Sequence, residues 1–462
     1  MMAYLRRRKD VAAVVGLVFL FFVVVIPMVS SGGGDVVIEE GESGSLRGSG
    51  WRWLTVVDAG SSGCRAHVFR WRTSRSGVVE VDPTHNNLKV KPGLSSFAGD
   101  PGAAGASLKP LLEFVLGEIP EAEWSASPIF LKATAGLRMT AEGPRERILE
   151  SVRDALAASP LSFDDRNAGA LVIDGTDEGG YGWMSVNYLL GNLDGHAKAS
   201  DFVGVVEMGG ASAQVTQIRD PREATAPPPG YGFDFKIGKT PFHLYTHSYL
   251  GYGLEQARET LSAHLVARHG GATTKVRDPC LNDGFLKLAA DARSDVYDGA
   301  SDVDVRGVAV GHDECHRAVD KALFSKNLPC DQPACSFNNV FQPPSLPKGK
   351  LLVFENFYYT GAMLGVPAPD TTPRAFADGA REVCAVDWAA LQTSQFPKCC
   401  GEKEELNKLC FSATYLNLFL EKGVQVAPDA HILLQQKVGD HGIDWSLGAA
   451  IHEAAVLAHG AH

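Results

Sequence analysis

The sequence has no excess of basic residues and lacks the motifs by which many enzymes hold phosphate. It contains 43 Lys and Arg residues against 54 Asp and Glu residues, which gives a net charge of −11. This balance argues against nucleic acid as a partner, because a phosphate backbone requires a basic face. The chain has no GxxxxGKS/T loop, no aspartyl-phosphate motif and no lysine positioned to replace a metal ion. Any phosphate binding must therefore rely on metal ions and backbone donors.

No charged residue interrupts the apolar run 11–29, which follows the basic segment Arg6 to Lys9. The run approaches the ~20 residues needed to cross a bilayer and is longer than the apolar region of a cleaved signal peptide. We expect a cytoplasmic tail at 1–10, a transmembrane signal-anchor at 11–29 and a flexible stem at 30–50. The rest of this type II membrane protein would be luminal or extracellular. Cleavage of a signal peptide near Ser30 is the alternative.

Cysteine is scarce in the first half of the chain and concentrated in the second. Cys64 stands alone, whereas the other eight cysteines are Cys280, Cys315, Cys330, Cys335, Cys384, Cys399, Cys400 and Cys410. They fit an oxidising compartment, and we expect disulfides among the eight, which allow 105 connectivities. A zinc cluster is the alternative, but the adjacent pair at 399–400 and the lack of matched CxxC pairs disfavour it. Disulfides would staple a loop-rich region at 278–346, and Cys64 would be a free thiol.

Alternating strand and helix patterns indicate an α/β protein with more than one core. For 462 residues, two core-bearing domains are expected. The strand–turn–strand pattern of the first part of the chain restarts at Asp201. We therefore expect an internal duplication with a cleft between two related domains. The first would span 51–195, completed by about 440–462, and the second 196–439.

Two glycine-rich turns, each between apolar strands, carry the strongest chemical signal. The first is DAGSSGCR (58–65) and the second is EMGGASAQ (207–214). Asp58 and Glu207 stand at strand ends, where a carboxylate can hold a divalent cation directly or through water. The small residues that follow can offer backbone N–H groups and hydroxyls to phosphate. Two such turns facing each other predict a phosphate clamp.

The segment DEGGYGW (177–183) supplies a candidate general base. Two carboxylates precede a double glycine, which lets the backbone pass close to a ligand, and a helix is expected to begin there. Glu178 would deprotonate a water molecule beside a phosphate. The alternative is that Asp177 or Glu178 caps the helix N-terminus. ATAGLR (133–138) also follows a strand, but taken alone it is explained by a tight turn.

Two further patterns are interpreted as structural. His243 and His247 have the i, i+4 spacing of zinc-binding helices, but the HExxH glutamate is missing, so we expect packing instead. The apolar segment 447–458 is short and contains His452 and Glu453, which indicates a buried helix rather than a second membrane span.

Four motifs resemble the successive motifs of the apyrase (nucleoside triphosphate diphosphohydrolase) family, in this order and spacing: DAGSSGCR, ATAGLR, DEGGYGW and EMGGASAQ. YTHSYLGYG, NFYYT and IDWSLGAA extend the resemblance over about residues 51–452. It implies a duplicated actin-like, sugar-kinase-like (ribonuclease H-like) fold with a nucleotide cleft. It also implies hydrolysis of the terminal phosphates of nucleoside tri- and diphosphates. The N-terminal anchor is similar to that of single-span plant-type and Golgi-type members, so a Golgi or plasma membrane is expected.

The resemblance assigns catalytic roles to four residues. Glu178 is expected to be the base, Ser212 and Gln214 to orient the attacking water, and Thr134 to help at the terminal phosphate. The residues expected to bind phosphate in the two turns are Gly60, Ser61, Ser62, Gly210 and Ala211.

The resemblance also implies a cofactor and a contact to the nucleotide base. A Ca²⁺ or Mg²⁺ ion is expected between Asp58 and Glu207, held mainly through water. Tyr359 of NFYYT is expected to stack on the base. The family pattern further suggests three disulfides, Cys330–Cys335, Cys384–Cys410 and Cys280–Cys315.

Two departures from the family pattern keep alternatives open. Glu207 stands where aspartate is usual, and Cys64 stands where serine or threonine is usual, which would weaken a phosphate contact and expose the site to thiol reagents. One alternative is a Golgi-type nucleoside diphosphatase that prefers GDP or UDP. Others are a catalytically weakened nucleotide-binding protein and a sugar kinase or exopolyphosphatase on the same fold.

Overall fold

The computed structural model describes residues 50–462 except 75–76, 195, 199, 220–226, 269–274, 288–303, 326–327, 333, 344–349, 398–402 and 460–462. The expected tail and anchor, most of the stem, and Cys399 and Cys400 lie outside the described residues. Within the described part, no helix has the length and apolar character needed to cross a membrane.

In the described part of the chain, strands form two large sheets and two small ones. The strands of the large sheets are β1 (Arg52–Ala59), β2 (Cys64–Thr73), β3 (Val79–Val81), β4 (Asn86–Val90), β5 (Ile129–Ala133), β6 (Ala170–Val172), β7 (Gly204–Met208), β8 (Ser212–Ile218), β9 (Gly232–Ile237), β10 (Thr240–Leu250), β14 (Leu351–Glu355), β15 (Asp370–Thr371) and β16 (Ile432–Leu434). The small sheets consist of β11 (Lys275–Asp278), β12 (Leu286–Lys287) and β13 (Asp304–Gly307), and of β17 (Lys437–Val438) and β18 (His441–Gly442).

The two large sheets share one strand order and one set of directions. The first runs β3-β2-β1-β5-β6, and the second contains the run β10-β8-β7-β14-β16. In both, the first two pairings are antiparallel and the last two are parallel. The first sheet also has β4 beside β2, and the second is extended by β9 and β15. In both sheets, a glycine-rich turn joins the corresponding antiparallel pair, β1–β2 or β7–β8.

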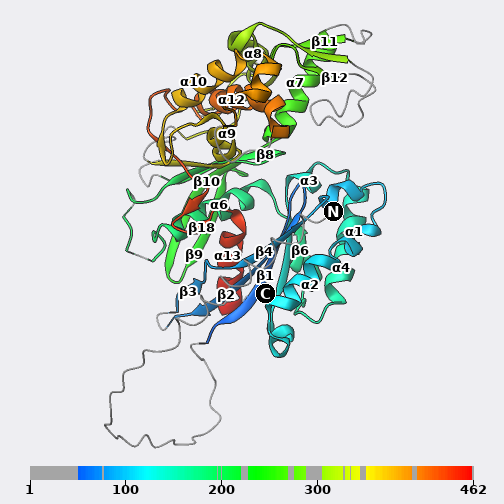
Figure 1. Ribbon diagram of the computed structural model, residues 1–462. Helices are drawn as coiled ribbons and strands as arrows, with labels where there is room; N and C mark the ends of the chain where they lie inside the picture. Colours follow the sequence, from blue (N-terminus) through cyan, green and yellow to red (C-terminus); the bar gives the residue numbers. More distant parts are fainter. Residues whose placement is uncertain are drawn as a thin grey trace, which may run out of the picture. The chain divides into compact units, whose positions relative to one another are not determined.

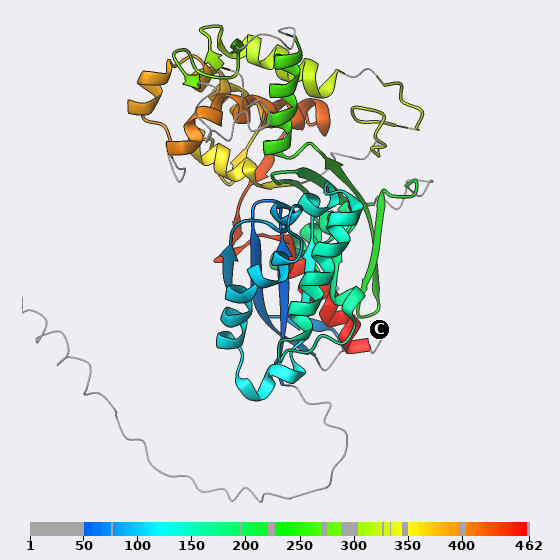
Figure 2. The same ribbon diagram turned by 90° about the vertical axis from the view of Figure 1, so that its right-hand side faces the viewer.

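Helices cover both sheets and fill the space between them (Figures 1 and 2). The helices are α1 (Ala103–Ser107), α2 (Lys109–Glu118), α3 (Ala135–Arg138), α4 (Glu142–Ala157), α5 (Arg166–Gly169), α6 (Gly175–Leu189), α7 (Leu254–Arg268), α8 (Gly311–Val319), α9 (Asn356–Leu364), α10 (Pro373–Cys384), α11 (Trp388–Thr393), α12 (Leu409–Leu418) and α13 (Trp445–His459). The α/β class expected from the sequence is confirmed.

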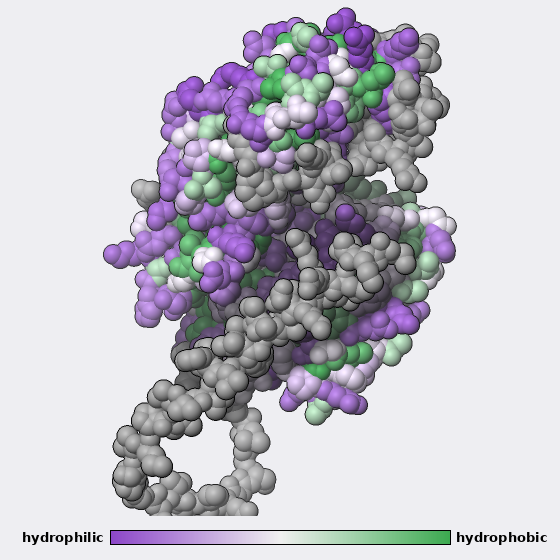
Figure 3. Space-filling model, viewed as in Figure 1, coloured by the Kyte–Doolittle hydropathy of each residue, from purple (hydrophilic) through white to green (hydrophobic). Residues whose placement is uncertain are grey.

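Alternating side chains of the strands enter three hydrophobic clusters. Val57 of β1 packs with α1, α2 and α4, whereas its neighbour Val56 packs toward α6 and α13. Val205 of β7 joins the same central cluster as Val56, and Val206 points to the cluster under α7–α12. Because successive strand residues face opposite sides, each sheet is buried on both faces. On the face shown in Figure 3, the surface is hollowed between the first sheet with its helices, below in the view, and the group α7–α12, above. Hydrophilic residues line the hollow.

The central helices α6 and α13 cross at close range because small residues lie at the crossing. A Cβ added to Gly448 would come within 2.0 Å of the Tyr181 carbonyl oxygen. The Gly448 N–H donates to Ser185 Oγ at 2.8 Å. Helix α13 is the buried helix that the apolar segment 447–458 predicts, and it contacts β1, β2 and β3.

The cysteine-rich region is partly helical and carries the expected disulfides. Cys280–Cys315, Cys330–Cys335 and Cys384–Cys410 are bonded, which confirms the three pairs. The region 278–346, expected to be loop-rich, also contains α8, where charged residues on one face and Cys315, Ala318 and Val319 on the other form an amphipathic helix.

Candidate active site

The two glycine-rich turns lie against each other and against the end of β5. A Cβ added to Gly210 of the second turn would lie 3.2 Å from Ser61 Oγ of the first turn. A Cβ added to Gly136, just after β5, would lie 2.9 Å from Ser61 Cα. The approach at Gly136 leaves no room for a side chain. Ser61 of the first turn therefore lies next to Gly210 of the second turn and to the end of β5.

Thr134 joins the first turn through the backbone. Its N–H donates to the Ala59 carbonyl at 3.2 Å, and its side chain is buried. Where the motif ATAGLR alone suggests a tight turn, the structure has the short helix α3, whose last residue is Arg138. This helix directs Arg138 toward α6.

Helix α6 begins earlier than the sequence suggests. Asp174 caps it, accepting hydrogen bonds from the Thr176 and Asp177 N–H groups at 3.1 and 3.4 Å. Glu178 therefore lies inside the first turn, and the alternative that Asp177 or Glu178 caps the helix is wrong. The N-terminal end of a helix still favours its carboxylate.

The double glycine after Glu178 packs against protein rather than lying open to a ligand. A Cβ on Gly179 would come within 2.3 Å of Thr246 Oγ1 and 2.7 Å of Thr216 Oγ1. A Cβ on Gly180 would come within 2.4 Å of the Phe233 ring. The glycines thus allow α6 to lie directly on the second sheet, and this contact carries Glu178 to that sheet.

A chain of hydrogen bonds connects Glu178 with the expected water-orienting residues. Arg138 donates to the Glu178 carboxylate in a buried ion pair, and its Nη1 lies 3.3 Å from Ser248 Oγ. Gln214 Nε2 donates to Ser248 Oγ at 3.0 Å and to Ser212 Oγ at 2.7 Å. Glu178, Ser212 and Gln214 are thus placed within one network. Arg138 and Ser248 were not expected here, although they lie within the motifs ATAGLR and YTHSYLGYG.

Five carboxylates, of which Glu178 and Glu207 are buried and the other three partly buried, gather around the turns and repel one another. Burial, followed by the fields of Glu178 and Asp444, raises the pKa of Asp58 to about 8. Burial raises the pKa of Glu178 even though Arg138 opposes it. Burial and the fields of Glu178 and Glu355 raise the pKa of Glu207 well above its usual range. Carboxylates that repel one another in this way are stable together only when some of them are protonated or when a cation lies between them. Glu355 and Asp444 were missed, although they adjoin NFYYT and lie within IDWSLGAA.

The two carboxylates expected to hold the cation fit that role. Asp58 Oδ1 and Glu207 Oε2 are buried and have no hydrogen-bond partner among the described residues. Oxygen ligands of this type suit Ca²⁺ and Mg²⁺. Gly182 faces the longer Glu207 side chain, since a Cβ there would lie 3.1 Å from Oε2. The glycine leaves the space that the extra methylene of glutamate needs.

Glu355 is held in an unusual backbone conformation beside these acids. Its φ of 58° and ψ of −124° lie where a non-glycine residue costs about 1–3 kcal/mol. Gln436 holds it at both ends: Gln436 Oε1 accepts from the Glu355 N–H at 2.8 Å, and Gln436 Nε2 donates to Glu355 Oε1 at 2.9 Å. This fixed carboxylate adds to the negative charge around Glu207.

A lysine also reaches the first turn, although no sequence motif indicated it. Lys89 of β4 lies with its Nζ 3.3 Å from Ser62 Oγ. Burial and Arg65 lower the pKa of Lys89, whereas Asp58 raises it. Because β4 pairs with β2 beside the turn, only the fold reveals this cation.

Cys64 does not face a ligand. Its side chain is 1% exposed and belongs to the apolar cluster under β1 and β2. Burial and the Asp58 charge raise the pKa of this free thiol to about 12. The expected sensitivity to thiol reagents is therefore wrong for the folded chain, because both access and thiolate are lacking.

Tyr359 of α9 is open to solvent, since 44% of the residue is exposed. Its nearest aromatic neighbour is Tyr358, with ring centroids 5.9 Å apart. Burial of its inner part and the Glu355 charge raise the pKa of Tyr359.

His243 and His247 lie in strand β10 rather than in a helix, so a spacing of four residues separates them by roughly 13 Å and excludes a shared zinc ion.

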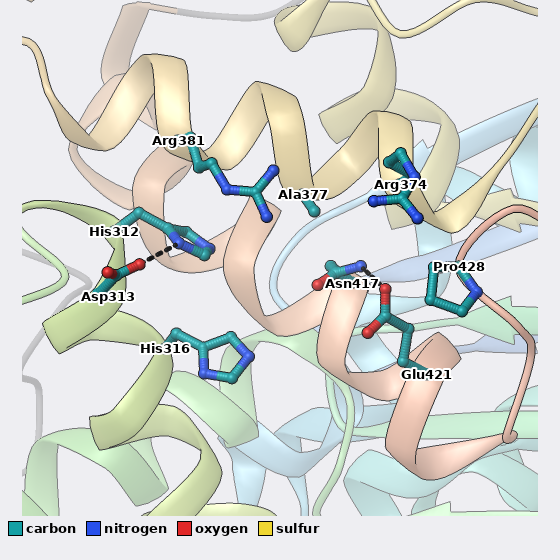
Figure 4. Close-up of a pocket in the computed structure, with 9 residues that line it drawn as sticks. All are labelled: His312, Asp313, His316, Arg374, Ala377, Arg381, Asn417, Glu421 and Pro428. Carbon is teal, nitrogen blue, oxygen red and sulfur yellow. Dashed lines mark hydrogen bonds and ion pairs between the residues drawn. The ribbon is translucent and has the colours of Figure 1, made fainter.

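A cavity of about 280 Å³ lies away from the turns, between α8, α10 and the end of α12 (Figure 4). Its two arginines are already paired, Arg374 with Asp429 at 2.5 and 2.8 Å and Arg381 with Asp378 at 2.5 Å. His312 and His316 point into the same space. The candidate active site is the region of the turns, where the unpaired carboxylates and the hydrogen-bond network meet.

Comparison with known proteins identifies the family. The GDA1/CD39 (nucleoside phosphatase) family matches residues 49–459, and the chain belongs to this family. Membership confirms the prediction of a nucleotide phosphohydrolase related to apyrases.

Relatives align over most of the chain. Probable apyrase 6 of Arabidopsis thaliana is 33% identical over 425 residues, covering 89% of this chain and 74% of the relative. Guanosine-diphosphatase of Schizosaccharomyces pombe is 31% identical over 418 residues, covering 87% and 73%. A crystal structure of nucleoside triphosphate hydrolases from Neospora caninum has the same fold, with a TM-score of 0.63, 17% identity and coverage of 88% of this chain and 93% of that one.

Proposed function

We propose that this chain hydrolyses the terminal phosphates of nucleoside tri- and diphosphates with a divalent cation, and that Glu178 activates the attacking water. One observation carries the proposal: Glu178 shares a hydrogen-bonded network with Ser212 and Gln214, beside two facing glycine-rich turns. Hydrolysis of a phosphoanhydride needs an in-line water, a base and neutralisation of spreading negative charge. The location supplies residues for each.

Glu178 is the group that takes a proton from water. Ser212 and Gln214 hold that water on the side of the terminal phosphate opposite the leaving group. Arg138 fixes the carboxylate of Glu178, and the raised pKa of Glu178 makes it a stronger base than an exposed glutamate. The backbone N–H groups of both turns and the Thr134 hydroxyl hold the phosphate oxygens, with Lys89 near Ser62 adding positive charge.

Asp58 and Glu207 hold Ca²⁺ or Mg²⁺, mainly through water, in this proposal. When bound, the cation neutralises charge on the phosphate oxygens. The unpartnered oxygens of Asp58 and Glu207 support this assignment. Nothing in the donor set favours zinc here, because all the ligand atoms are oxygens.

The substrate lies between two related domains of actin-like type in this proposal. The repeated strand order of the two large sheets supports a duplication. Tyr359, which is open to solvent, stacks on the nucleotide base, and a stacking ring suits any base, which favours broad selectivity. We further propose that residues 11–29 anchor the chain in a membrane of the secretory pathway, with the catalytic part luminal or extracellular.

The test is phosphate release by the full chain, purified under oxidising conditions. ATP, ADP, GDP, UDP and AMP are compared with Ca²⁺, with Mg²⁺ and with chelator. We expect cation-dependent release from di- and triphosphates and none from AMP.

Other outcomes point elsewhere. Release confined to GDP and UDP would favour the nucleoside diphosphatase alternative, which the guanosine-diphosphatase relative supports. Nucleotide binding without release would instead establish a binding protein.

A further inference from the structure

Two histidines and an aspartate converge on one point between three segments. His67 lies in β2, His85 lies in the loop before β4, and Asp444 lies just before α13. His67 Nδ1 is 2.8 Å from His85 Nε2 and 4.0 Å from Asp444 Oδ2. One ligating atom from each residue lies within 4.8 Å of the other two.

Neighbouring groups orient two of these side chains. His85 Nδ1 is 3.0 Å from the Pro83 carbonyl oxygen, which accepts its proton and leaves Nε2 with a lone pair facing His67. Asp444 Oδ1 accepts hydrogen bonds from the Ser446 N–H, at 2.8 Å, and from the Ser446 hydroxyl. Its Oδ2 is the oxygen directed at His67. Metal-binding histidines and carboxylates are held by outer partners in this way.

The spacing suits a tetrahedral metal ion. With bonds of about 2.0–2.1 Å, neighbouring ligand atoms of such an ion lie roughly 3.3 Å apart. The measured separations of 2.8 and 4.0 Å lie on either side of that value. His67 is buried, whereas His85 and Asp444 are partly exposed to solvent.

We propose that His67, His85 and Asp444 form a second metal site, specific for a zinc-class divalent ion. Two imidazole nitrogens suit zinc and disfavour Ca²⁺ and Mg²⁺, so the site is chemically distinct from the all-oxygen set at Asp58 and Glu207. A bound ion ties the first sheet to the segment that leads into α13. This proposal does not depend on the proposed hydrolysis. The competing explanation of the geometry is a hydrogen bond between the two histidines.

The test uses the full chain, stripped of metal and returned to buffer with excess Mg²⁺ to fill the oxygen-rich set. Zinc chloride is titrated calorimetrically, and Co²⁺ is added separately to read coordination from its visible absorption. The variants are His85→Ala and Asp444→Asn. The control is His316→Ala, since His312 and His316 on α8 have the spacing of a rival zinc pair.

We expect the wild type and His316→Ala to bind one zinc ion and to give a tetrahedral Co²⁺ spectrum. Each site variant should lose at least tenfold in zinc affinity and lose that spectrum. Circular dichroism checks that the variants fold. If Asp444→Asn does not fold, the zinc affinity of His85→Ala decides, because His85 is partly exposed. Three results would each overturn the proposal. They are zinc binding that is unchanged in His85→Ala, zinc binding that is lost only in His316→Ala, and a wild type that binds no zinc.

Discussion

The Arg138 guanidinium pairs with the Glu178 carboxylate and also reaches Ser248 of the second sheet. Arg138 ends the short helix after β5, so one side chain links the first sheet, α6 and β10. The position of Glu178 relative to Ser212 and Gln214 therefore depends on a residue outside the DEGGYGW motif.

Replacing Arg138 with methionine should shift the pH dependence of hydrolysis. Arg138 lowers the pKa of Glu178 against the effect of burial, so its loss raises that pKa further. The base then becomes charged only at higher pH. We expect the acidic limb of the kcat profile to move up by about one pH unit or more. Arg145→Met on α4, which removes a longer ion pair with Glu146 at 3.7 Å, should leave the limb in place. An unmoved limb in Arg138→Met would contradict the role of the pair.

Replacing Gly179 with alanine should destabilise the fold. The new Cβ would lie 2.3 Å from Thr246 Oγ1 and 2.7 Å from Thr216 Oγ1, in a buried contact between α6 and the second sheet. Overpacking of this kind costs about 1–3 kcal/mol of unfolding free energy. Gly117 of α2 has no atom within 4 Å of an added Cβ, so Gly117→Ala should be neutral or stabilising by up to about 1 kcal/mol. Denaturant unfolding measures both, and equal midpoints would show that α6 does not pack as described.

The metal-free chain should lose stability as pH rises. Burial raises the pKa of Asp58 to about 8 and that of Glu207 well above normal, so the folded state binds their protons more tightly than the unfolded state. Their contribution is present below pH 4 and is lost between about pH 4 and pH 8. A divalent cation binds the deprotonated acids, so it should raise Tm by a few degrees more at pH 8 than at pH 5.5. Scanning calorimetry with Mg²⁺ or chelator tests this, and Asp58→Asn should reduce the difference. A cation effect independent of pH would be the contrary result.

The disulfides should contribute unequally to stability. Cys280–Cys315 spans 35 residues and Cys330–Cys335 spans 5. In the chain-entropy account, the longer loop stabilises by about 1.5 kcal/mol more. Replacing Cys280 and Cys315 with serine should therefore lower the unfolding midpoint more than replacing Cys330 and Cys335. The opposite order in denaturant unfolding would rule out loop length as the main factor.

Local patterns predicted the strands and turns, because these depend on residues adjacent in sequence. ATAGLR was expected to follow a strand, which is β5, and the turns after Asp58 and Glu207 lie between paired strands as expected. The start of α6 was misplaced because Asp174, three residues before Asp177, supplies the cap. The capping residue was not distinguished from the carboxylates that follow it.

Side chains that reach the site from distant segments could not be predicted. Lys89 arrives through the pairing of β4 with β2, and Ser248 through the pairing of β10 with β8. Asp444 stands far along the chain, yet its charge acts on Asp58. Such contacts depend on sheet register and helix crossing, which a single sequence does not encode as a local pattern.

The central claim is that Glu178 is the base of phosphate release, and a pair of neighbouring substitutions tests it most directly. Glu178→Gln removes the base but keeps size and polarity, whereas Asp177→Asn makes the same chemical change one residue away. The measurement is steady-state phosphate release from ADP with Mg²⁺, with ADP binding measured alongside. The account predicts that Glu178→Gln binds ADP but loses roughly 10²–10⁴-fold in kcat, and that Asp177→Asn stays within a few-fold of wild type. A Glu178→Gln chain that turns over ADP near the wild-type rate would contradict it.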